Sequence, residues 1–366
     1  MGSATGAVEG MGMNSAFWRG RRVFITGHTG FKGSWFCLWL QRLGADVTGF
    51  ALAPATRPAL FEVASVARGM RSVIGDIRDA GALREAMASA KPEVVIHMAA
   101  QALVRESYAS PVETYSVNVV GTAQVLDVVR SCPSVRAVVS VTTDKCYENR
   151  EWPWGYRETD RLGGHDPYSS SKAGAELVTK AYRASFLDYA ESSVALASAR
   201  AGNVIGGGDW SRDRLIPDIM SAMEAGQAVR IRYPDAIRPW QHVLEPLSGY
   251  LALVERLCGD DGRNYAEAWN FGPTDADARP VRWIVAEMLE RWGDGSWVME
   301  AQPQPHEATY LKLDCSMAHA RLAWRPRWSL GDALGAIVDW QRAYQRGEDM
   351  RAFTLSQIAR FEETKV

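Results

Sequence analysis

Two short segments of this chain combine residue types and spacings that can do chemistry. Tyr168 and Lys172 stand four residues apart, so on a helix their side chains lie on one face. An ammonium group held near a phenol favours the phenolate, which is a base usable near neutral pH. Upstream, residues 27–33 have the sequence GHTGFKG between an apolar strand at 23–26 and an apolar helix at 34–40. Either segment alone is weak evidence of function, but together and in this order the two indicate a nicotinamide-dependent enzyme.

The glycine-rich segment has the features of a turn that binds a dinucleotide. Its glycines let the backbone approach a pyrophosphate, and the following helix offers unpaired N–H groups at its N-terminus. Asp76 closes a later strand, where its carboxylate can accept a hydrogen bond from an adenine amine. A helix N-cap is the alternative for Asp76, but Asp79 directly precedes the helix at 80–90 and suits that role better. His97 ends another strand, and we expect a core histidine with satisfied hydrogen bonds rather than a catalyst.

The elements that must position these residues alternate strands with helices over the first half of the chain. Strands are expected at 23–26, 46–50, 72–74, 94–97, 137–142 and 193–199, and helices at 80–90, 111–131 and 169–186. This pattern predicts an α/β fold with a Rossmann-type doubly wound parallel sheet. Ligands bind such sheets beyond the carboxyl ends of the strands, where the candidate residues stand.

Glycines and prolines divide the chain after Arg200 into shorter elements, which predict a smaller, loop-rich substrate-binding domain. We expect a helix at 247–257 that returns to the first domain, and a closing helical region at 324–344. The expected dinucleotide-binding domain is 17–204 with a return of 237–262, the substrate-binding domain is 205–236 with 263–335, and 1–14 is a disordered leader.

Composition argues against several classes of partner. The formal charge of −2 and the pI of about 6.3 give no electrostatic case for nucleic acid or an anionic membrane. The five cysteines are scattered without metal-ligand spacing, so we expect free thiols in a cytoplasmic protein and no metal site. No apolar run reaches the ~20 residues of a membrane-spanning helix, so we expect no membrane partner.

A third cluster follows the strand at 137–142. Thr143, Asp144 and Lys145 place an acid beside an amine at the strand end. A surface turn with an ordinary ion pair is the alternative, but the position in a dinucleotide-binding fold favours a separate proton donor and acceptor.

Later polar residues are candidates for binding a substrate. Arg232 and Arg238 could bind phosphate, because guanidinium groups match it bidentately, whereas Arg230 is expected to be solvated. Asn203 follows the strand at 193–199, where a buried amide could contact a sugar or phosphate oxygen.

Over about residues 17–340 the chain resembles the nucleotide-sugar 4,6-dehydratases, which are extended short-chain dehydrogenases/reductases. The glycine turn, HMAA at 97–100 and the tyrosine–lysine pair identify only the superfamily. More specific are QALVRESY at 101–108, TDKCY at 143–147, GNVIGGGDW at 202–210 and RPWQHVLEPL at 238–247. Lys145 departs from the wider family, in which Glu is common at this position, and is similar to the CDP-glucose branch.

The resemblance implies conversion of CDP-glucose to CDP-4-keto-6-deoxyglucose and water, with NAD as a recycled cofactor. Tyr168, its pKa lowered by Lys172, would remove the C4-hydroxyl proton while NAD takes the C4 hydride, and Thr143 would hydrogen-bond the C4 oxygen. Lys145 would be the base at C5 and Asp144 the acid that protonates the departing C6 hydroxyl.

The motifs and the resemblance together define the expected ligand contacts. Cofactor contacts are expected from Gly27, Thr29, Gly30, Phe31, Lys32, Gly33, Asp76, Ile77, Ala99, Ala100, Gln101, Tyr168 and Lys172. Substrate contacts are expected from Arg105, Ser107, Tyr108, Asn203, Trp210, Arg214, Arg238, Gln241, His242 and Tyr310. The helices at 111–131 and 169–186 resemble the pair through which the family forms a homodimer or a higher homo-oligomer.

Some alternatives stay open at this point. The strand at 46–50 ends without the acidic residue that usually holds the ribose of NAD, so this position gives no selection against NADP. We expect NAD because no arginine directly follows the strand; Arg57 lies further into the loop. A 4-epimerase or reductase on the same fold would need Tyr168 and Lys172 but not the acid and amine at 144–145. A regulator that binds NAD without catalysis would not need the complete set of Tyr168, Lys172, Thr143 and Asp144.

Overall fold

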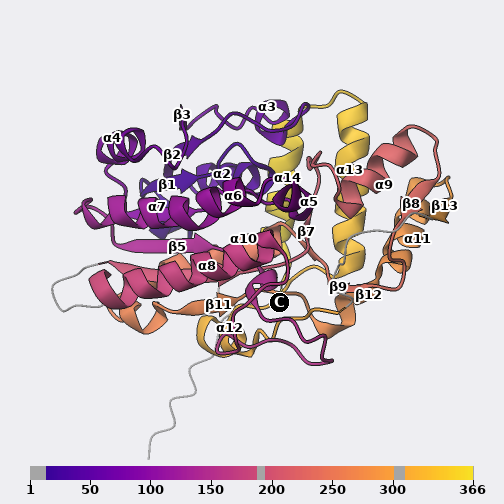
Figure 1. The fold of residues 1–366 in the computed structure, drawn as a ribbon. Helices are drawn as coiled ribbons and strands as arrows, with labels where there is room; N and C mark the ends of the chain where they lie inside the picture. The colour runs from indigo at the N-terminus through magenta and orange to yellow at the C-terminus, as the bar shows by residue number, and fades with distance from the viewer. Residues whose placement is uncertain (1–13, 188–193, 301–309, 366) are drawn as a thin grey trace, which may run out of the picture.

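A seven-stranded sheet, in which all neighbouring strands run parallel, forms the centre of the molecule (Figure 1). The computed structural model describes residues 14–187, 194–300 and 310–365. In spatial order the strands are β11 (Ala268–Asn270), β6 (Ala195–Arg200), β5 (Ala137–Val141), β4 (Val94–His97), β1 (Arg22–Thr26), β2 (Asp46–Ala51) and β3 (Arg71–Ile74). The expected doubly wound sheet is confirmed. Its strand order reverses between β1 and β4, where such sheets bind ligands.

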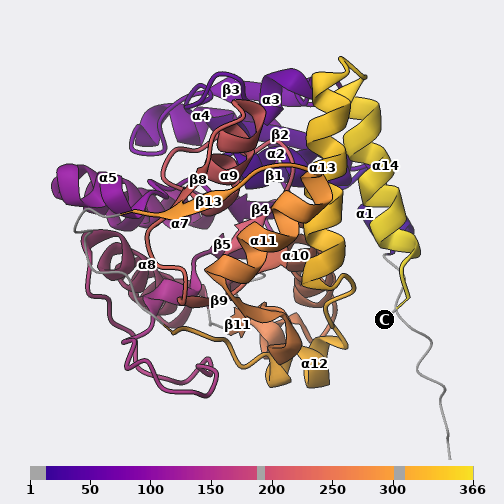
Figure 2. The same cartoon turned by 90° about the vertical axis from the view of Figure 1, so that its right-hand side faces the viewer.

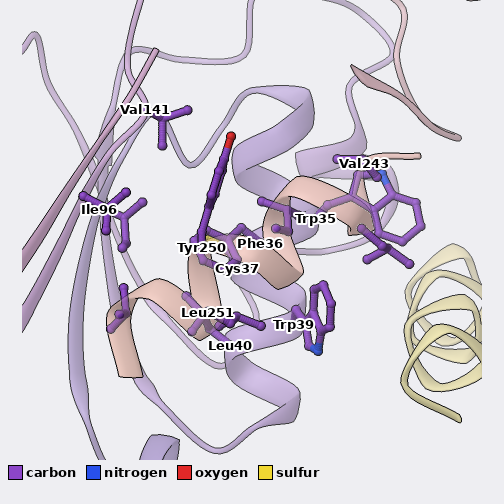
Figure 3. Packing of buried hydrophobic residues seen from close by; sticks show 14 of the residues in the cluster. Trp35, Phe36, Cys37, Trp39, Leu40, Ile96, Val141, Val243, Tyr250 and Leu251 are labelled. Carbon is purple, nitrogen blue, oxygen red and sulfur yellow. The ribbon is translucent and has the colours of Figure 1, made fainter. Parts of the chain in front are cut away.

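Helices cover both faces of the sheet, because alternate side chains of each strand point to opposite sides. The covering helices are α2 (Phe31–Arg42) and α10 (Leu244–Leu257) on one face, and α4 (Ala80–Ala90), α7 (Gly121–Arg130) and α8 (Pro167–Tyr182) on the other. In β1, Ile25 belongs to the first core and Phe24 to the second. Figure 3 shows part of the first core, where Tyr250 of α10 packs with Ile96 and Val141 of the sheet.

Two of the expected helices change helical type along their length. Residues 111–131 form α6 (Pro111–Tyr115), a π-helical segment η1 (Ser116–Val120) and then α7. The expected helix at 169–186 is α8, which continues into a second π-helical segment, η3 (Arg183–Leu187). An apolar repeat with a helical period does not distinguish these segments from a regular α-helix.

A smaller lobe lies beside the sheet and has its own core (Figure 2). Its helices are α9 (Leu215–Glu224), α11 (Val281–Trp292) and α13 (Leu330–Gln345). Its short strands pair in twos: β7 (Val204–Ile205) with β10 (Gln241–His242), β8 (Val229–Ile231) with β13 (Trp297–Met299), and β9 (Ile237–Pro239) with β12 (Ala278–Pro280). Strand β11 lies within the range 263–335 that we expected in the second domain, yet it pairs with β6.

The closing region differs from the expected helix at 324–344. Residues 323–329 are not helical, because Pro326 interrupts the segment and Ser329 begins α13 through a capping box with Asp332. A last helix, α14 (Met350–Glu363), which the sequence did not predict, packs against α13. The two lie side by side in both views (Figures 1 and 2).

Short elements complete the described chain. They are α1 (Ser15–Trp18), α3 (Leu60–Val63), α5 (Val104–Ala109), α12 (Ser316–Leu322), and the 3₁₀ turns η2 (Asp144–Cys146), η4 (Gly262–Tyr265) and η5 (Asp275–Asp277). Of the expected leader, residues 1–13 lie outside the described residues, as does Ser193 of the expected sixth strand. Among the helices of the described ranges, none has the length and apolar character that a bilayer crossing requires.

Candidate active site

The turn after β1 brings the backbones of two strands into close contact. Gly27 has a φ of +82°, and a Cβ placed there would lie 2.7 Å from the backbone nitrogen of Ala99, after β4. A Cβ on Gly33 would lie 2.2 Å from the carbonyl oxygen of Gly27. Helix α2 begins after Gly30 without a side-chain cap, so its first N–H groups can bind an anionic group. The turn therefore has the space and the donors that a pyrophosphate needs.

A cavity of about 1120 Å³ lies beyond the strand ends, between the sheet and the smaller lobe. Pockets for one small ligand usually measure roughly 300–1,000 Å³, so this cavity can hold a cofactor and a substrate together. The expected residues that line it are Gly27, Thr29, Gly30, Phe31, Lys32, Gly33, Asp76, Ile77, Ala99, Ala100, Gln101, Arg105, Thr143, Asp144, Lys145, Tyr168, Lys172, Asn203, Trp210, Arg214 and Arg238. Leu52, which follows β2, and Arg57 also line it.

At the β3 end of the cavity, Asp76 is held by Arg78, whose role the sequence did not indicate. The Arg78 guanidinium donates to Asp76 through Nε at 3.0 and 3.1 Å and through Nη2 at 2.6 Å. These bonds hold the pKa of Asp76 below its usual value, so the carboxylate stays charged. Asp79 caps α4 by accepting the N–H groups of Gly81 and Ala82, which is the division of roles expected for the two aspartates.

The residues after β4 are fixed by Asn118 of η1, a role that no local sequence pattern indicated. Gln101 donates its backbone N–H to Asn118 Oδ1 at 2.9 Å, and Asn118 Nδ2 donates to the Gln101 carbonyl at 3.0 Å and to Ser171 Oγ on α8 at 2.8 Å. His97 is buried, and both its ring nitrogens are hydrogen-bonded to threonine hydroxyls, at 2.8 and 3.0 Å. Burial lowers the pKa of His97 to about 3, so it is a neutral core residue.

Tyr168 and Lys172 of α8 are both buried and line the cavity. Burial raises the pKa of Tyr168 to about 12, while a hydrogen bond with Thr143 and the charge of Arg214 act in the opposite direction. Burial lowers the pKa of Lys172 to about 8, against the charge of Glu176. Desolvation of a phenolate outweighs these two contributions, and the lowering of the Tyr168 pKa that we expected from Lys172 stays a prediction.

Asp144 is held on both carboxylate oxygens at the end of β5. The Thr143 hydroxyl donates to Oδ1 at 2.9 Å, and Asn203 Nδ2 donates to Oδ2 at 3.3 Å. A Cβ on Gly202 would lie 1.9 Å from Oδ2, so only glycine leaves room for the carboxylate. Asp144 is 1% exposed, whereas Lys145 beside it is half-buried.

Lys32 adds a further cation to this part of the cavity. Burial, with a smaller contribution from the charges of Lys172 and Arg214, lowers the pKa of Lys32 to about 7, and the charge of Asp144 acts in the opposite direction. The side chain of Lys32 is thus electrostatically coupled to the candidate catalytic groups as well as belonging to the glycine turn.

Paired charges line the arm of the cavity next to the smaller lobe. Arg105 of α5 forms an ion pair with Asp213 at 3.1 Å, and Arg214 forms one with Asp209 at 3.2 Å. Arg238 is 8% exposed and lines the same cavity. This arm offers guanidinium groups of the kind that bind a diphosphate.

Five expected substrate residues do not line the cavity: Ser107, Tyr108, Gln241, His242 and Tyr310. Ser107 is buried, and its hydroxyl donates to the carbonyl of Val104 one turn earlier. Tyr108 is 45% exposed.

The other three of these residues have packing or bridging contacts. Gln241 donates through Nε2 to the carbonyls of Gly202 at 3.2 Å and Phe271 at 2.9 Å, so it holds the loop that packs on Asp144. His242 is buried between the rings of two tryptophans, with centroids 4.8 and 5.7 Å away. The Tyr310 hydroxyl donates to the carbonyl of Pro153 at 3.2 Å.

A buried ion pair supports α8 from behind. Arg200 Nη2 lies 2.7 Å from Glu176 Oε2, and both side chains are at most 4% exposed. Hydroxyls of Thr142 and Ser198 also donate to Glu176, at 2.5 and 2.8 Å. This network joins the helix that bears Tyr168 to β5 and β6. Nothing in the sequence pattern paired these residues.

Comparisons with known proteins agree with this geometry. A family model described as GDP-mannose 4,6 dehydratase matches residues 24–336. The CDP-glucose 4,6-dehydratase of Salmonella typhimurium is 57% identical over 91% of this chain and 94% of its own length. A dTDP-glucose 4,6-dehydratase of Streptomyces venezuelae, solved with NAD bound, has a TM-score of 0.77 and 25% identity over 89% of this chain and 98% of its own. A UDP-glucose 4-epimerase of Thermotoga maritima shares the fold, with a TM-score of 0.78 and 21% identity over 88% of this chain and 99% of its own.

The sheet, the glycine turn and the Tyr168–Lys172 pair define a Rossmann-type protein of the extended short-chain dehydrogenase/reductase class. Within that class, the chain belongs to the GDP-mannose 4,6-dehydratase family, whose model spans most of its length.

Proposed function

We propose that this protein is an NAD-dependent CDP-glucose 4,6-dehydratase, which converts CDP-glucose to CDP-4-keto-6-deoxyglucose and water. The observation that supports this most strongly is the 57% identity to a CDP-glucose 4,6-dehydratase over nearly the full length of both chains. The cavity contains the groups that such a dehydration requires: a phenol, a carboxylate and two amines.

The glycine turn fits NAD. Gly27 and Gly33 leave space that any Cβ would fill, and the uncapped start of α2 faces that space with N–H donors. Asp76, kept charged by Arg78, is available to an adenine amine at the far end, and Leu52 after β2 introduces no cation for a 2′-phosphate. When bound, NAD supplies reversible oxidation of the sugar at C4 and reduction at C6, so no cofactor is consumed.

Each catalytic side chain has a separate role. Tyr168 takes the C4-hydroxyl proton, with Lys172 as the cation that favours its phenolate, and Thr143 hydrogen-bonds the C4 oxygen. Lys145 takes the C5 proton, which the neighbouring ketone has made acidic. Asp144 protonates the C6 hydroxyl as it leaves as water.

The arm lined by arginines is the proposed site of the substrate diphosphate. Arg105, Arg214 and Arg238 supply its guanidinium groups, and Asn203 and Trp210, which line the same cavity, are proposed to contact the rest of the substrate. The proposed domain division is 17–204 with 237–262 and β11 as the cofactor domain, and 205–236 with the rest of 263–335 as the substrate domain.

The proposed assembly is a homodimer through α6, η1, α7, α8 and η3. This layer exposes large apolar side chains: Val112 at 82%, Leu177 at 57%, Val120 at 50%, Phe186 at 42% and Tyr115 at 39%. Large apolar side chains exposed on neighbouring helices are typical of an interaction surface. The proposed compartment is the cytoplasm, where all five cysteines would stay reduced as the free thiols found here.

The direct test is incubation of the purified protein with NAD and, separately, the CDP, dTDP, UDP and GDP forms of glucose. We expect a 4-keto sugar, detected by its alkali-induced ultraviolet absorbance, with preference for CDP-glucose. Cytosine presents an amine where uracil and thymine present a carbonyl, and an unpaired acceptor in the pocket costs about 1–3 kcal/mol, or roughly ten- to a hundredfold. Equal turnover of dTDP-glucose would overturn the CDP assignment. Formation of a 4-epimer without a 4-keto product would overturn the dehydratase assignment.

A further inference from the structure

Asp213 joins two arginines that come from different parts of the fold. Arg105 lies on α5, which follows β4 of the central sheet, whereas Arg232 follows β8 in the smaller lobe. Arg105 Nη1 lies 3.1 Å from Asp213 Oδ1, and Arg232 Nη2 donates to the same oxygen at 3.0 Å. All three residues line the cavity. Two guanidinium groups therefore meet at one carboxylate oxygen inside the proposed substrate site.

The place of this oxygen also suits a phosphate. Guanidinium groups match the oxygens of carboxylates and phosphates with the same planar geometry, so two arginines that hold a carboxylate can hold a phosphoryl group instead. A carboxylate and a phosphate cannot occupy this place together, because two anions a few ångströms apart repel each other. Binding of a diphosphate at Arg105 and Arg232 therefore requires Asp213 to move away.

Asp213 is held in a way that lets it move at low cost. Its side chain is 40% exposed, and ion pairs with this much access to water are weak. Its backbone has a φ of +60°, a left-handed conformation that L-residues other than asparagine and aspartate rarely adopt. Asp218 Oδ2 lies 3.7 Å from Arg232 Nη2, so this arginine keeps a carboxylate neighbour when Asp213 moves. The two ion pairs can thus be exchanged for contacts with a ligand.

We infer that Asp213 competes with the substrate diphosphate for Arg105 and Arg232, an inference that rests on the proposed function. When the nucleotide binds, both guanidinium groups leave the carboxylate and contact phosphate oxygens, so Arg232 is a phosphate ligand in addition to Arg105. The product carries the same diphosphate, and the returning carboxylate competes with it as well. Asp213 therefore lowers the affinity for substrate and product alike and favours release of the product.

Two other roles for Asp213 would have different consequences. A carboxylate that only orients the arginines would improve binding, because it pre-organises Arg105 and Arg232, and its loss would weaken the affinity for nucleotides. A carboxylate that only repels the diphosphate would lower the affinity whether or not the arginines are present. Competition requires both that the loss of Asp213 strengthens binding and that this gain depends on the arginines.

The test measures the Kd of CDP by calorimetry at constant pH and ionic strength, with dTDP in parallel. Asp213→Asn should bind CDP about threefold or more tightly than the unsubstituted protein, because two weak ion pairs no longer have to be broken. Asparagine tolerates the left-handed conformation, so this variant should fold, which thermal unfolding checks. Asp235→Asn is the matched control and should leave the Kd unchanged. Asp235 lies between β8 and β9, forms an ion pair with Arg282 at 2.8 Å and does not line the cavity.

The second part of the test removes both arginines. Arg105→Gln with Arg232→Gln should weaken CDP binding by about tenfold or more, and adding Asp213→Asn to this pair should give no gain in affinity.

The inference is overturned if Asp213→Asn binds CDP equally well or more weakly, or if the gain in affinity is just as large without the two arginines. Failure of the proposed function would look different. In that case the unsubstituted protein would form no 4-keto sugar from CDP-glucose, whereas Asp213→Asn would still tighten the binding of the nucleoside diphosphate, CDP or dTDP, that the protein takes.

Discussion

Burial governs the protonation of the side chains around the reacting sugar. It raises the pKa of Tyr168 to about 12 and lowers those of Lys172 and Lys32 to about 8 and 7. In each case the neutral form is stabilised relative to the charged form, because the low-dielectric interior penalises charge. At neutral pH Lys32 is therefore only partly charged.

At this scale the first prediction concerns Tyr168→Phe. Only the phenolic oxygen is removed, so turnover should fall by about 10²–10⁴-fold while NAD binding stays close to normal. Steady-state assays with CDP-glucose and calorimetry with NAD measure the two effects. Substantial remaining turnover would exclude Tyr168 as the base at C4.

The acid and amine after β5 are tested by combining Asp144→Asn with Lys145→Met. The double variant should still oxidise the sugar at C4, seen as a rise in reduced-nicotinamide absorbance, because Tyr168 is untouched. It should lose water at least about 10²-fold more slowly, and the C5 hydrogen should not exchange with deuterated solvent. Normal dehydration would show that 143–145 is only a structural turn.

At the scale of elements, the site lies at the C-terminal ends of the strands and the start of α2. A buried network around Glu176 holds α8 against the sheet. Lys172 and Glu176 are one turn apart on α8, and Glu176 is paired with Arg200 of β6. The orientation of the tyrosine–lysine pair thus depends on contacts behind the helix as well as on those in the cavity.

Glu176→Gln should affect both stability and pH dependence. Removing one partner of a buried ion pair leaves Arg200 uncompensated and should lower the free energy of unfolding by about 3–5 kcal/mol, measured with urea. The charge of Glu176 raises the pKa of Lys172, so its loss should shift that pKa further down. Because the ammonium form is lost as pH rises, the alkaline fall of kcat/KM, near pH 8 in the normal protein, should move to lower pH.

Glu348→Gln is the matched control, since its ion pair with Arg346 has side chains 41% and 58% exposed. It should change the free energy of unfolding by less than about 0.5 kcal/mol and leave the pH profile unchanged. An unshifted alkaline limb in a folded Glu176→Gln variant would contradict the coupling to Lys172.

The sequence predicted the elements better than the contacts between them. The strands and the glycine turn follow from apolar runs and a local spacing, and Tyr168 and Lys172 share one helix, so local patterns were sufficient. Gly202 is required by a carboxylate on another strand end, and Glu176 by an arginine on β6, which are tertiary contacts without a local signal. His242 was expected to contact the substrate but is buried in the core. The motif around it does not show which of its side chains point into the core and which into the cavity.

At the scale of the whole molecule, the exposed apolar side chains of α6, η1 and α8 belong to the interface of the proposed homodimer. Val112→Asp with Leu177→Asp should convert the dimer to a monomer in analytical ultracentrifugation, because the interface would bury two unpaired charges in each protomer. Met299→Asp, at a side chain 66% exposed on β13, is the control and should stay dimeric. A monomeric unsubstituted protein, or an unaffected double variant, would contradict the assembly.

The most direct test of the whole account follows the hydrogen on C4 of the sugar. CDP-glucose labelled with deuterium at C4 is converted with the purified protein and unlabelled NAD, and the product is analysed by mass spectrometry and NMR. Internal redox dehydration predicts a 4-keto-6-deoxy sugar with the deuterium at C6 of the same molecule, and no net reduction of NAD. Deuterium found at C4 of an epimer, or retained in released reduced cofactor, would contradict internal redox dehydration.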